Sequence, residues 1–252
     1  LNTPAAEASG QVLLTVLRDA LFSGPGAADL LLPTAPLDEL LPRPAVAWLQ
    51  ARGVDWRPGR RVQAIKPQAA GGWRVDGEPC DRLLLACGPR ESARLLAPWA
   101  PDWSTRAMAL AYQPIVTVWL RSPGVKPGRP MVRLRGEPAQ FAFDLQALQG
   151  MPDTWALVVS GAGTWVAQGQ EAIVQAALAQ WRAAWPGAPE ARVIAVRTEK
   201  RATFACTPAL QRPSAAPCRD LDVAGDHVDG PYPATLEGAV RSGREAVDRL
   251  AR

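Results

Sequence analysis

The sequence predicts a mixed α/β (α+β) fold, in which a mainly antiparallel sheet with helices stands beside a smaller parallel unit. Two stretches, 83–96 and 221–244, read as a buried strand, a Gly-containing turn and a helix, the repeating unit of α/β folds. Between them, residues 114–204 hold several runs with a period of two, as expected of antiparallel strands. Amphipathic runs at 8–21 and 170–185 add helices with one apolar side.

Length and composition limit the class of protein. The 252 residues suffice for one large or two modest domains with a sizeable core, and 48% hydrophobic residues is typical of a globular chain. The formal net charge of +4, from 28 basic and 24 acidic side chains, is mild and scattered. Because no block of like charge or basic stripe occurs, nucleic acid is not an expected partner.

Cysteine and histidine are sparse and badly spaced for metal binding. Cys80, Cys87, Cys206 and Cys218 form no C-x-x-C pair, and His227 is the single histidine. The sequence therefore predicts no metal site and disfavours a Ser-His-Asp hydrolase, which His227 leaves formally open. Free thiols in a reducing compartment are the expectation.

No apolar run approaches the roughly 20 residues that span a bilayer, and no signal peptide is recognised. A cytoplasmic protein is expected, with peripheral contact at the inner face of a membrane left open. The chain starts at Leu1 within the approach to a helix, so a longer polypeptide is also expected. The oligomeric state is not predicted.

The N-terminal quarter is expected to be helical and irregular by turns. The helix at 8–21 is interpreted as packing on the protein's own core, with membrane contact as the alternative. Residues 30–44 are rich in Leu and Pro and predict irregular chain with a helical turn at 37–41. Pro44 suits the first residue of a helix over 45–52, which Gly53 ends.

Beyond Gly53 the period changes to two. Strands separated by Pro-Gly, Gly-Gly and Asp-Gly turns are predicted at 54–56, 60–66, 73–75 and 81–86. Residues 83–86 are apolar on both faces, which indicates a buried parallel strand. The turn at Gly88 then leads to a helix at 91–96; Gly88 could admit a ligand or make an ordinary turn.

The middle of the chain reads as an antiparallel sheet with one long helix. Strands are predicted at 114–120, 131–135, 140–145, 155–160 and 192–204, the helix at 170–185, and a loop at 208–217. Aromatic side chains alternate along these strands, and an apolar pocket or ordinary core packing would both account for them. The candidates for pocket walls are Trp119, Phe141, Phe143 and Trp155.

The stretch 221–244 is the strongest candidate for a ligand site. A helix start offers unpaired N–H groups to an anion, and Asp226, just after the strand, can accept hydrogen bonds from sugar hydroxyls. An ordinary turn explains the Gly-Asp pair equally well.

These motifs together resemble the flavoprotein superfamily of amine oxidases and phytoene desaturases. Ala224-Gly225-Asp226, followed by the run 232–239, resembles the second FAD motif, whose Gly-Asp pair meets the ribityl and pyrophosphate portion. Residues 61–65 resemble the segment in which a valine backbone pairs with the adenine, and 81–89 resemble a strand ending beside the dinucleotide. The resemblance implies FAD as cofactor. The contacts it implies are Val62, Cys87, Gly88, Gly225, Asp226, Tyr232, Pro233, Ala234, Thr235 and Leu236.

The resemblance also implies a division into domains. A partial FAD-binding Rossmann-like domain would be interleaved with a substrate domain built on the mainly antiparallel sheet and helices. The segments would be substrate-domain helices at 1–43, an FAD-domain segment at 44–98, the substrate domain at 99–204 and a C-terminal FAD-domain segment at 205–252.

A narrower resemblance is to the squalene-associated FAD-dependent desaturases, or hydroxysqualene dehydroxylases. The segments that carry it are 1–4, 16–19, 114–118, 199–204 and 232–242. It implies reductive dehydroxylation of hydroxysqualene to squalene in bacterial hopanoid biosynthesis. The N-terminal G-x-G-x-x-G of that family is absent, so the chain resembles its C-terminal portion, and FAD binding by this chain alone stays open. His227 stands where the family has a bulkier aromatic.

The mechanism that the resemblance implies is hydride delivery from reduced flavin to an allylic carbon as the hydroxyl leaves as water. The candidates for the acid are Asp144, Lys200, Arg201 and Tyr232, each equally compatible with a structural role. Alternatives are a carotenoid-desaturase-like or amine-oxidase-like flavoenzyme, a non-catalytic isoprenoid-binding fragment, and a chain that completes a flavin site with another chain.

Overall fold

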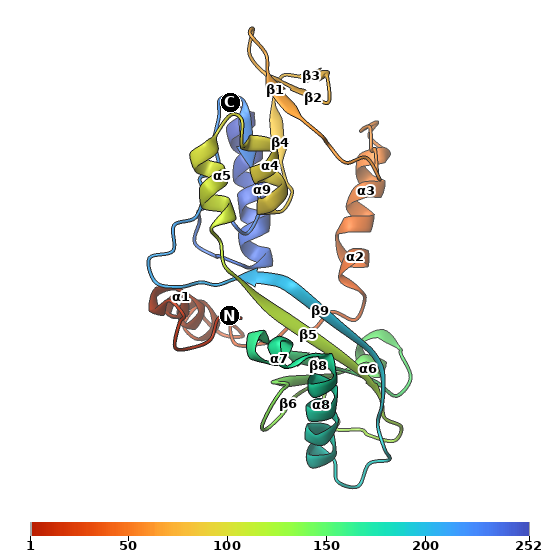
Figure 1. The fold of residues 1–252 in the computed structure, drawn as a ribbon. Coiled ribbons are helices and arrows are strands. Elements are labelled where there is room, and N and C mark those ends of the chain that lie inside the picture. Colours follow the sequence, from red (N-terminus) through yellow and green to blue (C-terminus); the bar gives the residue numbers. More distant parts are fainter. Residues whose placement is uncertain (1, 252) are drawn as a thin grey trace.

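The computed structural model describes residues 2–251 and confirms the mixed α/β fold. Two units lie one above the other in Figure 1. The lower unit is an antiparallel sheet with helices, and the upper unit contains the two short parallel strands. The long strands β5 and β9 run from beneath the upper unit into the lower one (Figure 1).

The antiparallel sheet has five strands in the order β6-β7-β8-β5-β9. They are β5 (Tyr112–Arg121), β6 (Met131–Arg133), β7 (Phe141–Asp144), β8 (Thr154–Val159) and β9 (Arg192–Phe204). Each was predicted from its alternating pattern to within a few residues. The β5–β9 pairing shifts register between Gln113 and Ile115, so the strands pair irregularly near Tyr112.

One face of this sheet carries the main core. Helix α8 (Gln170–Ala184) packs on it through Ile173, Ala177 and Trp181. Trp155 is 1% exposed, and its ring centroid lies 5.1 Å from that of Trp181. Two short helices, α6 (Leu145–Gln149) and α7 (Gly163–Gln168), border the same sheet.

The opposite face, here called the open face, carries Trp119, Phe141 and Phe143. In the register, Trp119 and Phe143 both pair with Ala156, and Phe141 pairs with Val158, so these side chains share a face. All three aromatics are half-buried. Trp155 neighbours Ala156 on the same strand and therefore points to the core face. The expectation that all four aromatics bound one pocket is wrong for Trp155, because side chains alternate between faces.

The upper unit is built on a two-stranded parallel sheet of β4 (Leu83–Leu85) and β10 (Leu221–Val223), paired Leu83 to Leu221 and Leu85 to Val223. It packs with α4 (Pro89–Leu96), α5 (Pro101–Met108) and α9 (Leu236–Leu250). This pairing joins segments predicted as separate parts of one FAD domain. The division into domains itself stays a prediction.

A three-stranded antiparallel sheet precedes β4, formed by β1 (Ile65–Pro67), β2 (Trp73–Val75) and β3 (Glu78–Cys80). The strand predicted at 54–56 is absent, and the one predicted at 60–66 begins only at Ile65. Side chains, rather than a neighbouring strand, bind the backbone of 62–64, as described below. Strand β3 was not predicted, because Glu-Pro-Cys shows no alternation of apolar and polar residues.

The N-terminal helices are α1 (Gly10–Leu21), α2 (Leu37–Leu40) and α3 (Pro42–Gln50), the last starting earlier than predicted. None of them contains a buried residue. The expectation that the helix at 8–21 packs on the protein's own core is therefore wrong. Only Val12 touches a small cluster with Leu110, Phe204 and Cys206.

None of the helices in residues 2–251 combines the length and apolarity needed to cross a bilayer. Within the same residues, no three His, Cys, Asp or Glu side chains are grouped to hold a metal ion.

The core face predicts a stability effect. Trp155→Ala should lower the free energy of unfolding by about 3–5 kcal/mol, because it leaves a cavity between β8 and α8. Trp56→Ala, at a side chain that is 48% exposed, should change it by less than about 0.5 kcal/mol. Urea denaturation followed by circular dichroism measures both. Equal effects of the two substitutions would contradict the assignment of Trp155 to the core.

Candidate active-site cleft

The two strand-turn-helix junctions meet at one cleft. Because β4 and β10 are parallel and in register, their carboxyl ends lie at the same edge, where α/β folds bind ligands. The turn after β4 contributes Gly88 to the cleft, and the turn after β10 contributes Asp226. The start of β5 and the end of β9 close the other side with Tyr112 and Phe204. The cleft has a volume of about 1010 Å³, large enough for a sizeable organic ligand.

The lining combines charge with apolar surface. Arg90, Arg94 and Arg201 face the cleft together with Glu91, Glu199 and Asp226. The apolar part comes from Ala93, Ala97, Met108 and Phe204. A ligand with a polar portion and a flat or apolar portion would find partners for both.

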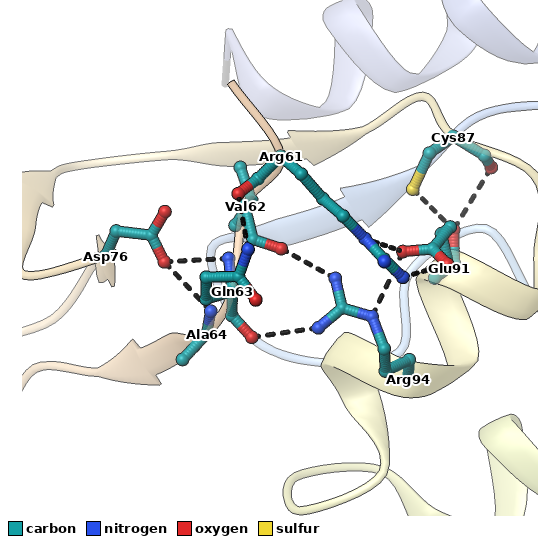
Figure 2. A network of polar contacts seen from close by, with 9 residues as sticks. Arg61, Val62, Gln63, Ala64, Asp76, Cys87, Glu91 and Arg94 are labelled. Atoms are coloured by element: carbon teal, nitrogen blue, oxygen red, sulfur yellow. Dashed lines mark hydrogen bonds and ion pairs between the residues drawn. The ribbon is translucent and has the colours of Figure 1, made fainter. Parts of the chain in front are cut away.

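Arg94, on helix α4, forms hydrogen bonds with the irregular segment 61–64 (Figure 2). Its guanidinium donates to the carbonyl of Val62 at 2.6 Å, to the carbonyl of Gln63 at 2.9 Å and to Glu91 at 3.0 Å. The carbonyl of Val62, the residue predicted to meet adenine, is therefore already occupied. Val62 does not line the cleft but lies behind its Arg94 wall.

Two carboxylates complete this network in Figure 2. Asp76 accepts from the N–H groups of Gln63 and Ala64, both at 2.9 Å, and these bonds hold the pKa of Asp76 below its ordinary value, with the Ala64 amide contributing most. Hydrogen bonds from Arg61 and then Arg94 lower the pKa of Glu91. Asp76 thus binds the backbone where a strand had been predicted, whereas Glu91 binds the side chains of Arg61 and Arg94.

The Gly225-Asp226 pair contacts Ser242 of helix α9 and the ring of His227. The Gly225 N–H donates to the Ser242 hydroxyl at 2.9 Å. A Cβ at Gly225 would lie 2.5 Å from the His227 ring, so only glycine fits without a shift. The buried His227 ring lies edge-on to Trp103, with centroids 6.3 Å apart. This ring fills the space between the turn and Trp103.

The Asp226 carboxylate remains available. Its nearer oxygen lies 3.8 Å from His227 Nδ1, beyond hydrogen-bond distance. Among the residues described, no donor forms a hydrogen bond to it. Asp226 thus presents a free acceptor to the cleft, as predicted for a group that binds hydroxyls.

The run 232–236 forms the start of α9. Thr235 caps the helix: its hydroxyl accepts from the Gly238 N–H at 2.9 Å and donates to the Tyr232 carbonyl at 2.8 Å. A Cβ at Gly238 would collide with that carbonyl, which explains the glycine. The Arg241 guanidinium lies over the Tyr232 ring, 4.6 Å from its centroid.

Of the ten predicted cofactor contacts, Gly88 and Asp226 line the cleft. Tyr232 lines a small hollow that also touches Asp226, and Pro233 borders a groove next to α1. Cys87 points to Ser92, 3.3 Å away, and Leu236 is exposed on the outside of α9. The remaining contacts stay predictions.

The predicted acids are scattered. Arg201 lines the cleft and Lys200 borders a shallow hollow beside it. Asp144 instead caps α6, accepting from the N–H groups of Gln146 and Ala147. Asp144 pairs with Trp155 on β8, and Trp155 in turn pairs with Leu120 on β5. Leu120 lies eight residues along β5 from Tyr112, which is roughly 25 Å in an extended strand. Asp144 is therefore too distant to act in the cleft.

Sequence reasoning missed Tyr112 and Arg212. Burial, assisted by the negative charge of Asp226, raises the pKa of the Tyr112 phenol, so this cleft hydroxyl keeps its proton. Arg212 donates to the carbonyl of Val228 at 2.6 Å and to that of Gly230, and burial lowers its pKa. It fixes the turn that follows Asp226. Neither residue belongs to a recognisable motif, because its partners are distant in sequence or are backbone atoms.

The open face of the sheet continues from the cleft. Glu199, which lines the cleft, pairs with Ile115, and both lie on the face that carries Thr117 and Trp119. A half-buried strip with Trp119, Phe141 and Phe143 therefore runs along this face, and Arg197, opposite Thr117, and Arg133, opposite Phe141, add charge to it.

Comparison with protein families gives one match over most of the chain. The family described as flavin containing amine oxidoreductase matches residues 19–251. Two curated relatives, both hydroxysqualene dehydroxylases, come from Rhodopseudomonas palustris and Sinorhizobium fredii. They are 29% and 26% identical to this chain over 98% of its length and 59% of theirs. The chain thus spans about three fifths of the curated relatives it matches.

Solved structures agree in fold. An oxidoreductase from Methanosarcina mazei superposes with a TM-score of 0.62 and 15% identity, covering 81% of this chain and 52% of that one. Putrescine oxidase bound to putrescine superposes with a TM-score of 0.56 and 16% identity, covering 84% of this chain and 53% of that one. At these identities the likeness concerns the fold alone.

The cleft predicts an unusual tyrosine titration. The chain has two tyrosines, so Tyr232→Phe leaves Tyr112 as the only phenol. Its ionisation, followed by ultraviolet difference absorbance, should occur above the ordinary pKa of about 10, and Asp226→Asn should bring it down. Since the folded state holds this proton more tightly, the free energy of unfolding should fall as pH rises above about 10. An ordinary midpoint in the folded protein would refute the buried environment.

Proposed function

The chain belongs to the family of flavin-containing amine oxidoreductases, and from this premise we propose that its cleft forms one side of an FAD site in an isoprenoid-converting oxidoreductase. The observation that carries the proposal is the convergence of Gly88 and Asp226, from junctions far apart in sequence, at the same cleft. The whole reaction also requires the part of the curated relatives that this chain does not match.

The residues present fit the polar part of FAD. Among the described residues no donor forms a hydrogen bond to the Asp226 carboxylate, so this carboxylate suits the hydroxyls of a ribityl chain. Gly88 has open space where a Cβ would stand, so a ligand could approach the backbone closely. When bound there, FAD would supply the hydride chemistry of the family. The start of α9, capped by Thr235, would add its positive end to the same site.

The proposed substrate is hydroxysqualene, reduced to squalene. The names of the two curated relatives support this choice, as does the apolar open face that leads away from the cleft. A long hydrocarbon needs a largely apolar channel, and Trp119, Phe141 and Phe143 would provide the apolar part of its wall. The part of the curated relatives that this chain does not match would supply the rest of that channel.

Within the cleft, the chain's own residues would bind, orient and protonate. Tyr112 is a hydroxyl that stays protonated, and we assign it the donation of a proton to the departing hydroxyl, which leaves as water. Arg201, in the same lining, could orient that oxygen through its guanidinium. Lys200 and Tyr232 border neighbouring hollows and remain weaker candidates.

Product analysis tests the function. The protein at its native length, purified and loaded with FAD, is given hydroxysqualene and a reductant, and the extract is analysed by gas chromatography with mass spectrometry. Squalene formation supports the proposal. Bound flavin with no squalene would remove the substrate assignment and leave the flavin site intact.

Asp226→Ala should weaken FAD binding. Loss of a hydrogen bond to a neutral hydroxyl costs about 0.5–1.5 kcal/mol, or about 2- to 13-fold in Kd. Asp248→Ala is the matched control, because Asp248 is an exposed carboxylate on α9 that lies outside the cleft. Flavin fluorescence quenching measures both constants. Equal affinities of the wild type and Asp226→Ala would contradict the role given to Asp226.

Peripheral membrane contact is a further part of the proposal. Helix α1 exposes Leu13, Leu14, Leu17 and Phe22, although it was expected to pack inward. Amphipathic helices of this kind bind at lipid interfaces through their apolar face. A hydrocarbon substrate dissolved in a bilayer would reach the cleft most directly from there.

The double variant Leu14→Glu with Phe22→Glu should reduce binding to phosphatidylcholine vesicles in a flotation assay, because it places charge on the apolar face. Met151→Glu, at an exposed apolar residue in the lower unit, should leave binding unchanged. If the wild-type protein does not float with the vesicles, this surface has no lipid role.

A further inference from the structure

The pairing of β9 with β5 is irregular beside the cleft. Thr203 of β9 lies opposite Gln113 of β5. The next pair along the two strands joins Glu199 to Ile115. One residue of β5 therefore faces three residues of β9, which are the residues 200–202, here called the β9 bulge.

The β9 bulge changes where the side chains of this strand point. Side chains of a regular strand alternate between two faces, yet the consecutive residues 201–204 all line the cleft. Bulges re-aim side chains in this way, and they are over-represented next to active sites. Arg201, which lies within the bulge, thus reaches the cleft together with its neighbours.

Local sequence explains why the two strands pair irregularly here. On β5, Pro114 has no N–H to donate, and its carbonyl accepts from the Ala162 N–H at 3.0 Å. Proline within a sheet is found chiefly at edges and bulges. On β9, the Glu199 carboxylate accepts from the Arg201 N–H at 3.3 Å, and so bonds a backbone group that lies outside the ladder. Residues of both strands therefore favour the bulge over a regular ladder.

Asn2 cross-links the strands at this place. Its amide nitrogen donates to the Gln113 carbonyl at 3.2 Å and to the Thr203 hydroxyl at 3.0 Å. Its amide oxygen accepts from the N–H of Gly161, which lies between β8 and α7. Both donors and the acceptor of the side-chain amide are therefore bonded. Because a bulge lacks ladder bonds of its own, its position depends on such contacts.

These contacts lie next to the two side chains assigned to the departing hydroxyl. Tyr112 directly precedes Gln113, whose carbonyl Asn2 binds. Arg201 is two residues from Thr203, whose hydroxyl Asn2 binds. Burial raises the pKa of Tyr112, whereas the positive charge of Arg201 opposes this rise, so the guanidinium acts on the phenol across the cleft lining.

We propose that Asn2 is a positioning residue of the cleft. By holding Gln113 and Thr203 together, its amide keeps the β9 bulge in place and keeps Arg201 beside Tyr112, so that both groups reach the same substrate oxygen. Asn2 itself is not part of the cleft lining. The inference rests on the proposed function, in which Arg201 orients that oxygen and Tyr112 protonates it.

Titration of Tyr112 tests the inference without flavin or substrate. In the Tyr232→Phe chain, Tyr112 is the only phenol, and its ionisation is followed by ultraviolet difference absorbance. Arg201→Gln should raise the midpoint, because it removes a cation that stabilises the phenolate. In the Asn2→Ala background the same substitution should change the midpoint less, because the guanidinium is no longer held beside the phenol.

Gln180→Ala is the matched control for a purely structural effect. Like Asn2, the buried Gln180 amide binds an irregular segment, donating to three carbonyls of residues 135–139 and accepting one N–H from them. This segment lies outside the cleft lining. Gln180→Ala should lower the free energy of unfolding and leave the effect of Arg201→Gln on Tyr112 intact.

Circular dichroism at each pH establishes that the variants are folded during the titration. If Asn2→Ala unfolds, Thr203→Val takes its place in the same comparison. This substitution removes one partner of the Asn2 amide and preserves the shape of the side chain.

Product analysis on the protein at its native length adds a second readout. Asn2→Ala should lower kcat by about tenfold or more with FAD affinity unchanged, since a misplacement of about 1 Å can cost about a hundredfold in rate. The double variant Asn2→Ala with Arg201→Gln should be no slower than Arg201→Gln alone, because Asn2 acts through Arg201. If the wild type makes no squalene, the proposed function fails, and the titration still decides the inference.

Two results would overturn the inference. In the first, Arg201→Gln changes the Tyr112 midpoint equally with and without Asn2, or leaves it unchanged when Asn2 is present. In the second, the effects of Asn2→Ala and Arg201→Gln on kcat multiply, which would make Asn2 a contributor to the fold that is independent of Arg201.

Discussion

The parallel pairing of β4 with β10 is the contact on which the rest of the upper unit depends. It joins Leu85 to Val223, and so brings Gly88 and Asp226 to one edge. Two three-residue strands have little stability of their own. The pairing therefore relies on Leu96, Trp103 and Val228 packed around it, and on the buried Asp222 held by Arg249. Such a buried pair costs desolvation, so its main effect is to fix where the last turn of α9 lies.

Around the cleft, hydrogen bonds from polar side chains to the backbone replace the backbone hydrogen bonds that join strands in a regular sheet. Arg94 and Asp76 bind the backbone at 62–64, and Arg212 binds the carbonyls after Asp226. Hydrogen bonds between a charged side chain and the backbone are stronger than those between neutral groups. Each of these three side chains joins its own segment to another part of the chain. The turns facing the cleft are thus held in place without strands, which leaves their remaining groups open to a ligand.

The sequence predicted what depends on local pattern. Alternation located all five strands of the large sheet, and the Gly-Asp turn pointed to a ligand site. The sequence-based predictions failed for features that depend on contacts between residues distant in sequence. The 60–66 strand was replaced by Arg94 and Asp76 contacts, and the helix at 8–21 lacks the core that its pattern implied. Asp144 looked available in sequence because nothing local shows that it caps α6. Tyr112 has no motif at all; only the cleft reveals it.

The two faces of the five-stranded sheet differ in how completely their side chains are buried. The core face is filled by α8 and by tryptophans in ring contact, so it contributes stability and admits no ligand. The open face keeps Trp119, Phe141 and Phe143 half-buried. Apolar area left partly accessible weakens the isolated sheet, since burying it would be favourable. Because this strip begins at Glu199 in the cleft, it is the surface along which the proposed hydrocarbon substrate would lie, with its polar end towards Tyr112 and Asp226.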